Sequence, residues 1–250
     1  MRKCLRRRRR MRRRITVVSK QYHPAPILET MSPPAARRVF LLSPAHCGGE
    51  RAKLLFRPQA RFELAVQLRT PMGAPLGEVF QFLSGLYFRG KLAYAHRFAN
   101  PPADIRGQWI ITTNRGLLPA DTYVTLSELA KMGRVPIDAE DARYRRPLKR
   151  SLIELNQRCG DACEFVLLGS IATGKYVDVL RHVLGPRLRF PTEFVGRGDM
   201  SRGGLMLRCV DEGRELTYVE IDGATRHGTR PPKLQRRVLP RPSAPLNRMP

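Results

Sequence analysis

The chain has 250 residues, of which 42% are apolar, so it can bury a full hydrophobic core as one domain. No run approaches the ~18 apolar residues that a membrane span needs, which excludes a bilayer-spanning helix and favours a soluble, cytoplasmic protein. Five cysteines at irregular spacing exclude a disulfide scaffold, and no third or fourth zinc ligand accompanies Cys159 and Cys163.

The formal net charge of +25 is concentrated at the two ends of the chain. Residues 1–31 hold eleven Lys or Arg against one acidic residue, residues 222–250 hold seven against one, and +9 remains for 32–221. We therefore expect a disordered basic extension over 1–31, one α/β domain over 32–221, and a disordered Pro-rich tail over 222–250. An over-extended translation start is the first reading of the extension, and a dispensable tail or a basic arm for nucleic acid or anionic lipid are the alternatives.

Short apolar strands alternate with amphipathic helices along the domain. Strands are predicted at 39–43, 109–113, 164–168, 188–190 and 215–221, the last at a sheet edge. Helices are predicted at 51–68 with an interruption at Pro58, at 79–98, within 121–131, at 147–158, at 176–184, and within 191–208. This order predicts a mainly parallel, short-stranded sheet with helices on both faces, a Rossmann-like three-layer sandwich.

The loop after the third predicted strand carries the pattern G-x-x-x-x-G-K, which is typical of phosphate-binding loops. Tyr176 stands where a nucleotide triphosphatase needs Ser or Thr for Mg²⁺, so we expect a cradle for a smaller phosphate or a nucleoside, without metal. A plain strand-to-helix turn is the alternative. The candidate ligand contacts in this loop are Gly169, Ser170, Thr173, Gly174 and Lys175.

Two earlier loops also follow predicted strands, at the edge where open α/β sheets bind ligands. Ser43, Gly48, Gly49 and Arg51 are the candidates after the first strand, and Asn114 and Arg115 are those after the second. In the first loop, a nucleophilic Cys47 assisted by His46 competes with a buried packing role for that thiol.

The segment GRGDMSRGG, residues 196–204, concentrates glycines, a carboxylate, a hydroxyl and two arginines. Arg197, Ser201 and Arg202 are candidates to hold phosphate, because guanidinium groups bind phosphate in bidentate fashion. Asp199 is a candidate base or ribose ligand, with helix capping as the alternative.

Four stretches carry a resemblance to known proteins: the Ser/Cys turn after the first strand, GLYFRGKLAYA at 85–95, TTNRGLLP at 112–119, and LGSIATGKYVDVL at 168–180. In these stretches the chain resembles uncharacterised bacterial α/β domains of unknown function. More loosely, it is similar to a bacterial family tied to peroxide stress and DNA binding. The resemblance implies an α/β domain connected to nucleotides or nucleic acid, and it implies no catalytic residue.

Two functional hypotheses follow. The first is a pocket for a nucleotide or another phosphate-bearing ligand, which as an enzyme would be a metal-independent transferase, glycosidase or hydrolase with Asp199 or Asn114 acting on sugar or base. The second is a non-catalytic nucleic-acid-binding module that uses basic tails and surface Arg and Lys. Neither requires a cofactor or a membrane, and the sequence specifies no oligomeric state.

Overall fold

The computed structural model describes residues 36–235, and its centre is a six-stranded, mainly parallel sheet. The basic segment expected over 1–31 lies outside the described residues, as does 236–250. The strand order is β4-β3-β1-β6-β7-β8, in which β1, β3, β6 and β7 run parallel while β4 and β8 pair antiparallel at the two edges. The strands are β1 (Arg37–Leu42), β3 (Gln108–Ile111), β4 (Leu117–Pro119), β6 (Cys163–Leu168), β7 (Leu188–Pro191) and β8 (Tyr218–Glu220).

The two central strands are apolar because both of their faces are covered. The side chains from Val39 to Leu42 in β1 and from Phe165 to Leu168 in β6 are fully buried, and the strands pair in register from Arg37 with Cys163 to Leu42 with Leu168. Burial on both faces explains the continuous apolar runs, which the sequence shows in place of an alternating pattern.

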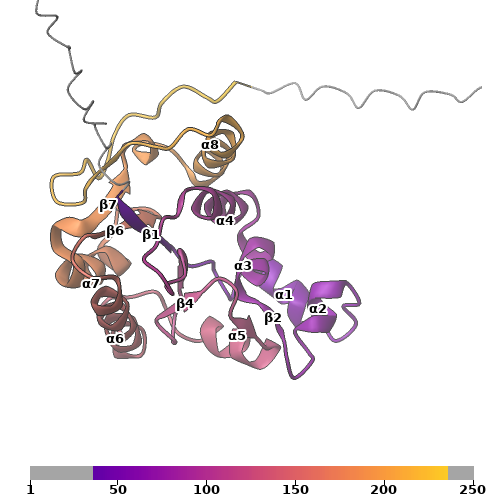
Figure 1. Cartoon of the computed structure of the whole chain (residues 1–250). Helices are drawn as coiled ribbons and strands as arrows, with labels where there is room; N and C mark the ends of the chain where they lie inside the picture. Colours follow the sequence, from indigo (N-terminus) through magenta and orange to yellow (C-terminus); the bar gives the residue numbers. More distant parts are fainter. Residues whose placement is uncertain (1–35, 236–250) are drawn as a thin grey trace, which may run out of the picture. The chain divides into compact units, whose positions relative to one another are not determined.

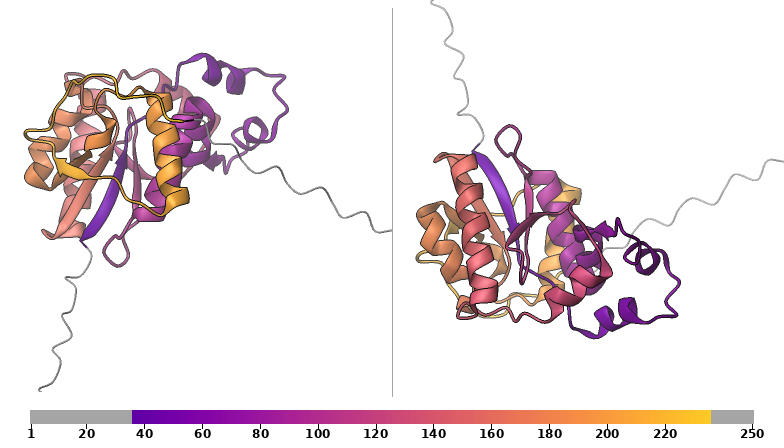
Figure 2. Two further views of the ribbon diagram at one scale, coloured as in Figure 1. Left: turned by 90° about the horizontal axis from the view of Figure 1, so that it is seen from above. Right: turned by 90° about the horizontal axis from the view of Figure 1, so that it is seen from below.

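Helices lie on both sides of the sheet. Figures 1 and 2 show α4 and α8 on one side and α6 and α7 on the other. Beyond α4, the small helices α1, α2 and α3 and the two-stranded pair of β2 (Ala74–Pro75) and β5 (Tyr123–Val124) extend the domain (Figure 1). The helices are α1 (Glu50–Phe56), α2 (Glu63–Gln67), α3 (Leu76–Ser84), α4 (Leu86–Phe98), α5 (Leu126–Gly133), α6 (Ala142–Cys159), α7 (Gly174–Leu184) and α8 (Asp199–Glu212).

The helix predicted over 79–98 is two helices, α3 and α4, divided at Gly85. Gly85 has φ of 59° and ψ of −131°, a conformation that is strained for any residue with a side chain. The guanidinium of Arg51 occupies the space beside it, 2.6 Å from where a Cβ would stand. The apolar spacing continues through the break, so periodicity alone did not reveal it.

Two glycines allow α4 and α8 to cross at very short range. A Cβ on Gly90 would lie 2.7 Å from the carbonyl oxygen of Gly203, and a Cβ on Gly203 would lie 2.7 Å from that of Leu86. Real Cβ atoms do not approach backbone so closely, so these helices touch backbone to backbone. The crossing places Lys91 of α4 next to the α8 turn that carries Arg202.

Local capping fixes the two helices between β5 and β6. The Thr125 side chain accepts the Glu128 amide at the start of α5, and the Glu128 carboxylate accepts the Thr125 amide, which forms a capping box. Asp141 is the N-cap of α6 and its side chain accepts the Arg143 amide, so the helix starts earlier than the predicted 147. Pro147 falls inside its first turns.

Part of the segment predicted as a tail lies against the domain. The Gly228–Thr229 backbone passes beside Gly196, and the Arg208 guanidinium donates to the Gln235 carbonyl. Residues 222–235 therefore run past the start of α8. Across the described residues 36–235, no helix combines the length and the apolar character needed to cross a membrane.

Candidate functional site

The loops after β1 and β6 meet at the centre of the sheet edge. The Ser43 amide donates to the Leu168 carbonyl over 3.2 Å, and a Cβ on Gly169 would lie 2.8 Å from the Ser43 Cβ. The chain leaves β1 towards β3 on one side, whereas β6 flanks β1 on the other. In open α/β sheets, a crevice forms where the order of the strands reverses in this way, and ligands bind in that crevice.

Lys91 reaches this junction from α4 and is buried there. Its side chain is 1% exposed, and its Nζ donates to the Ser43 carbonyl over 3.0 Å and lies 2.6 Å from the Ser43 Oγ. The same Nζ stands 4.0 Å from the centre of the Tyr87 ring, a cation–π distance. The pKa of Lys91 is lowered to about 7, chiefly by burial; the Asp199 carboxylate opposes this shift, and the Arg202 cation adds to it.

Tyr176 closes the junction from α7. Its hydroxyl donates to the Ser170 carbonyl over 2.8 Å and accepts the Ser170 amide over 2.9 Å. A Cβ on Gly169 would stand 2.8 Å from this hydroxyl, so only glycine fits between Ser43 and Tyr176. Burial raises the pKa of Tyr176, and its hydrogen bonds to Ser170 and to the Ser43 side chain oppose that effect.

Arg202 and Asp199 approach the junction from the first turns of α8. The Arg202 side chain is buried, its Nε donates to the Phe194 carbonyl over 3.2 Å, and its Nη1 stands 3.7 Å from Asp199 Oδ1. The Asp199 side chain is 67% exposed, so most of its charge is screened by water. The two buried basic side chains, Lys91 and Arg202, thus have one solvated carboxylate near them, that of Asp199.

The Tyr87 hydroxyl lies within the same buried group. It has no hydrogen-bond partner among the described residues. Burial raises the pKa of Tyr87, and the positive charge of Arg202 opposes the shift. A buried hydroxyl without a partner is costly, so this group retains an unused donor beside a cation.

An open cleft of 280 Å³ lies at the start of α8. The Arg197 Nε donates to the Glu193 carbonyl over 3.0 Å and its Nη1 to Ser201 Oγ over 3.2 Å, so this guanidinium is held in place. Three of the lining side chains are cationic and none is acidic. The cleft is lined by Arg197, Gly198, Met200, Ser201, Arg230, Pro231, Lys233 and Leu234.

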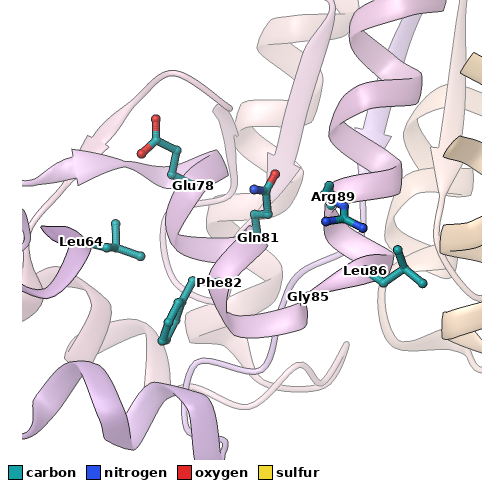
Figure 3. A pocket seen from close by; sticks show the side chains of 7 residues that line it. All are labelled: Leu64, Glu78, Gln81, Phe82, Gly85, Leu86 and Arg89. Atoms are coloured by element: carbon teal, nitrogen blue, oxygen red, sulfur yellow. The ribbon is translucent and has the colours of Figure 1, made fainter. Parts of the chain in front are cut away.

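A larger hollow of 570 Å³ between α3 and α4 has a different character (Figure 3). Figure 3 shows Gln81 between the carboxylate of Glu78 and the guanidinium of Arg89. One cation and one carboxylate give this hollow no charge excess. This hollow is larger than the α8 cleft, whereas the charge of its lining makes the α8 cleft the better site for an anion.

Several predicted ligand contacts point elsewhere. The guanidinium of Arg51 donates to the Phe82 carbonyl over 3.1 Å, towards α3. Gly48 lies near Gly133 of α5, and Gly49 is the N-cap of α1. The Cys47 thiol is buried, and burial raises its pKa to about 12, so the thiolate that a nucleophile needs is disfavoured and a packing role fits better.

The loop after β3 is tied to α5 and α6. Arg115 pairs with Glu128 over 3.0 Å, Thr113 Oγ1 donates to the Met132 carbonyl, and a Cβ on Gly116 would strike Pro147 and Ser151. The Oδ1 atom of Asn114 is buried without a partner among the described residues. The ion pair of Arg115 thus holds this loop against α5 rather than against the Ser43 junction.

The G-x-x-x-x-G-K loop contributes less through its lysine than its pattern predicts. Lys175 is exposed and makes no hydrogen bond or ion pair within 36–235. Thr173 is the N-cap of α7 but its side chain forms no capping hydrogen bond, and Gly174 opens the helix beside Asp178. Ser170 Oγ accepts the Ala172 amide over 3.3 Å. The loop meets Ser43 through Gly169 and Tyr176.

Sequence reasoning missed Lys91, Tyr87 and Tyr176 at the junction. Lys91 stood in an otherwise convincing amphipathic helix, where charged residues normally face water. The available signal was Gly90 beside it, because a helical glycine is expected where a neighbour approaches closely. Arg230 and Lys233 were missed because they lie in the segment predicted as a tail.

No group of three or more His, Cys, Asp or Glu side chains within 36–235 is arranged to hold a metal ion. The four cysteines of this range, Cys47, Cys159, Cys163 and Cys209, are all buried. In the comparisons with known proteins, no family model, no curated protein and no solved structure matches this chain.

Proposed function

We propose that this protein binds a phosphate-bearing ligand of the nucleotide class in the α8 cleft. The observation that carries the proposal is the lining of that cleft, where Arg197, Arg230 and Lys233 converge without a carboxylate. Like charges placed together are unfavourable unless an anion joins them, and guanidinium groups match phosphate oxygens geometrically.

The start of α8 adds to the attraction for an anion. Gly198, its N-cap, has no side chain to satisfy the first amides of the helix. Free amides and the helix dipole favour a phosphate at such an end. Arg197 is already held by Glu193 and Ser201, so less conformational entropy is lost when it binds.

The proposal agrees with a Rossmann-like, three-layer arrangement, which we infer from helices on both sides of a mainly parallel sheet. Proteins of that architecture bind nucleotides outside the carboxyl ends of their strands, where the Ser43 junction lies. The resemblance to bacterial domains of unknown function, and to the peroxide-stress family with its DNA connection, points towards the same ligand class. Bacterial origin and cytoplasmic location remain part of this proposal.

Asp199 does not line the cleft, but its exposed carboxylate follows Gly198 in the chain, and within this proposal it accepts a ribose hydroxyl of a ligand that extends beyond the lining. Ser201 and Arg202 follow it on α8. Asn114 takes no part, since its loop is tied to α5 and α6. Ser43 and Gly169, which were predicted as ligand contacts, lie at the neighbouring junction and not in the α8 cleft.

A second candidate function is a non-catalytic nucleic-acid-binding module. The formal charge of +25 favours it, because much of that charge can neutralise backbone phosphates. The two candidates differ in what they require. A nucleotide pocket needs the α8 cleft, whereas a module gripping the backbone loses affinity steeply with salt and depends little on any single cleft residue.

Titration calorimetry with ADP, pyrophosphate and adenosine tests the first candidate on the full chain. We expect ADP and pyrophosphate to bind and adenosine to bind much more weakly. The double variant Arg230→Ala/Lys233→Ala should raise the Kd for ADP at least about tenfold, since each charge-assisted hydrogen bond contributes roughly 1.5–3 kcal/mol before solvent screening. The control Lys131→Ala removes an exposed lysine of α5 and should leave the Kd unchanged.

Equal affinity for ADP in the double variant and in the control would contradict the nucleotide proposal. Tight binding of a single-stranded oligonucleotide that is unchanged in the double variant and falls steeply with salt would favour the module instead.

A further inference from the structure

Ser43 and Lys91 form a hydroxyl–amine pair that the cleft does not use. The two side chains come from β1 and α4, and 2.6 Å separates the Ser43 Oγ from the Lys91 Nζ. This is hydrogen-bond reach, the geometry that a nucleophile and its general base require. The second Nζ contact, to the Ser43 carbonyl over 3.0 Å, fixes the direction of the amine.

The surroundings of the pair favour a neutral amine near pH 7. The Lys91 side chain is fully buried between aromatic rings, with Tyr87 at 4.0 Å and Phe88 at 5.1 Å from Nζ. Arg202 adds a second positive charge, and Asp199 is the carboxylate that acts on the amine. Burial holds the pKa of Lys91 at about 7, so roughly half of these side chains can accept a proton at neutral pH.

We propose that Ser43 is a nucleophile and Lys91 its general base, and that the pair cleaves a phosphoester of the ligand held at this edge of the sheet. The choice of phosphorus as the atom attacked rests on the proposed function. It is favoured over a carbonyl carbon because Arg202 is a buried cation next to Gly203, which contacts Gly90 and so brings that turn of α8 to Lys91, where the guanidinium can stabilise negative charge on phosphoryl oxygens.

The reaction balances without a further reactant except water. In the first step the Ser43 hydroxyl proton moves to the Lys91 amine, the Oγ–P bond forms, and the P–O bond to the leaving alcohol breaks as Lys91 returns the proton to that oxygen. In the second step a water molecule gives a proton to Lys91, the water oxygen bonds to phosphorus, and the P–Oγ bond breaks. Ser43 Oγ then regains the proton, so that alcohol and phosphate are the products.

Access to Ser43 depends on Tyr176. Ser43 is 6% exposed, and the Tyr176 hydroxyl and Gly169 lie directly over it. The Tyr176 hydroxyl is anchored to Ser170 by two hydrogen bonds, so its release costs on the order of a few kcal/mol. The pair is therefore reached when the loop over 169–176 moves together with this side chain.

A fluorophosphonate probe tests the pair directly, because its serine adduct forms the same Oγ–P bond with loss of fluoride. We expect intact-protein mass spectrometry to find one adduct on the full chain, mapped by peptide sequencing to Ser43. The labelling rate should rise as pH increases through about 7, as Lys91 loses its proton.

Three variants separate the roles. Ser43→Ala should abolish labelling. Lys91→Met, which removes the base, and Lys91→Arg, which keeps a charge but cannot accept a proton, should each slow labelling by about 100-fold, the lower range for loss of a general base. Ser84→Ala, a half-buried serine of α3, is the matched control and should label as the wild type does. Circular dichroism and melting temperature check that each variant is folded.

Three outcomes would contradict the Ser43–Lys91 proposal. They are no labelling of the folded wild type, labelling at another residue, and labelling of Lys91→Met as fast as that of the wild type. Hydrolysis of 4-nitrophenyl acetate without hydrolysis of either 4-nitrophenyl phosphate or its bis ester would overturn the phosphoester class. ADP affinity separates the two proposals: Ser43→Ala should retain it. If the wild type binds ADP but is not labelled, the Ser43–Lys91 proposal alone is contradicted. If Ser43 is labelled but ADP does not bind, the proposed function is contradicted, and so is the assignment of a phosphoester substrate.

Discussion

The backbone contact between α4 and α8 makes a quantitative prediction about two adjacent glycines. Replacement of Gly203 by Ala puts a methyl group 2.7 Å from the Leu86 carbonyl oxygen and 2.8 Å from the Tyr87 Cα. Both are backbone atoms, so no side chain can rotate away and the helices must separate. Replacement of Gly204 by Ala meets only the Leu234 Cδ1 at 3.5 Å, an ordinary van der Waals distance.

Two opposing terms set the magnitude. Gly→Ala inside a helix gains about 1 kcal/mol of helix propensity at either position. At Gly203 the overpacking costs about 3 kcal/mol, the upper range for an inserted methyl, because the neighbours are backbone. We therefore expect Gly203→Ala to lose about 2 kcal/mol of unfolding free energy and Gly204→Ala to gain up to about 1 kcal/mol.

Thermal melting followed by circular dichroism distinguishes the two variants. At roughly 2–4 °C per kcal/mol for a domain of this size, Gly203→Ala should melt about 4–8 °C below the wild type, and Gly204→Ala at or slightly above it. Equal melting temperatures for Gly203→Ala and the wild type, or an equal fall in both variants, would refute the reasoning. Separation of α4 from α8 should also slow fluorophosphonate labelling in Gly203→Ala, because Gly203 adjoins Arg202 and faces the turn before Lys91.

Three further outcomes are expected. Lys91 has a pKa of about 7 in the folded protein and is protonated in the unfolded chain, so above pH 7 the unfolded state binds more protons. The free energy of unfolding should therefore rise with pH. In urea titrations, the wild type should gain about 1.5 kcal/mol relative to Lys91→Met from pH 7 to 8.5. Thr125→Ala removes one half of the α5 capping box and should cost about 1 kcal/mol in the same titrations. Gly169→Ala inserts a methyl between Ser43 and Tyr176 and should lower the melting temperature, with a cost of about 1–3 kcal/mol; a wild-type melting curve would show that the loop yields freely.

The order of the central elements could be predicted because each carries its own local signal. The runs VFLL and FVLL in β1 and β6 are apolar throughout, as strands covered on both faces must be, and Gly185-Pro186 ends α7. The edge position of β8 also followed from its place at the end of the predicted sheet. The antiparallel strand β4 could not be predicted, because the residues Leu117–Pro119 have the pattern of a loop. They form a strand only through their pairing with β3, in which Leu117 is opposite Ile111.

The structure brings some of the predicted site residues together. Ser43 and Gly169 do meet, because their strands are neighbours in the sheet, and Arg197 and Ser201 do share a cleft. The side chains of Arg51 and Arg115 have their partners on other elements, because a position after a strand does not determine where a long side chain finds its partner. Arg51 reaches the Phe82 carbonyl and Arg115 reaches Glu128.

The sequence alone determined the alternation of strands and helices, the excess of positive charge and the loops that end the parallel strands, since these depend on residues close together in the chain. The burial of Lys91 against Ser43 depends on packing between distant parts of the chain. Because Gly90 and Gly203 have no Cβ, two helices more than a hundred residues apart come into backbone contact, and the lysine is left 1% exposed.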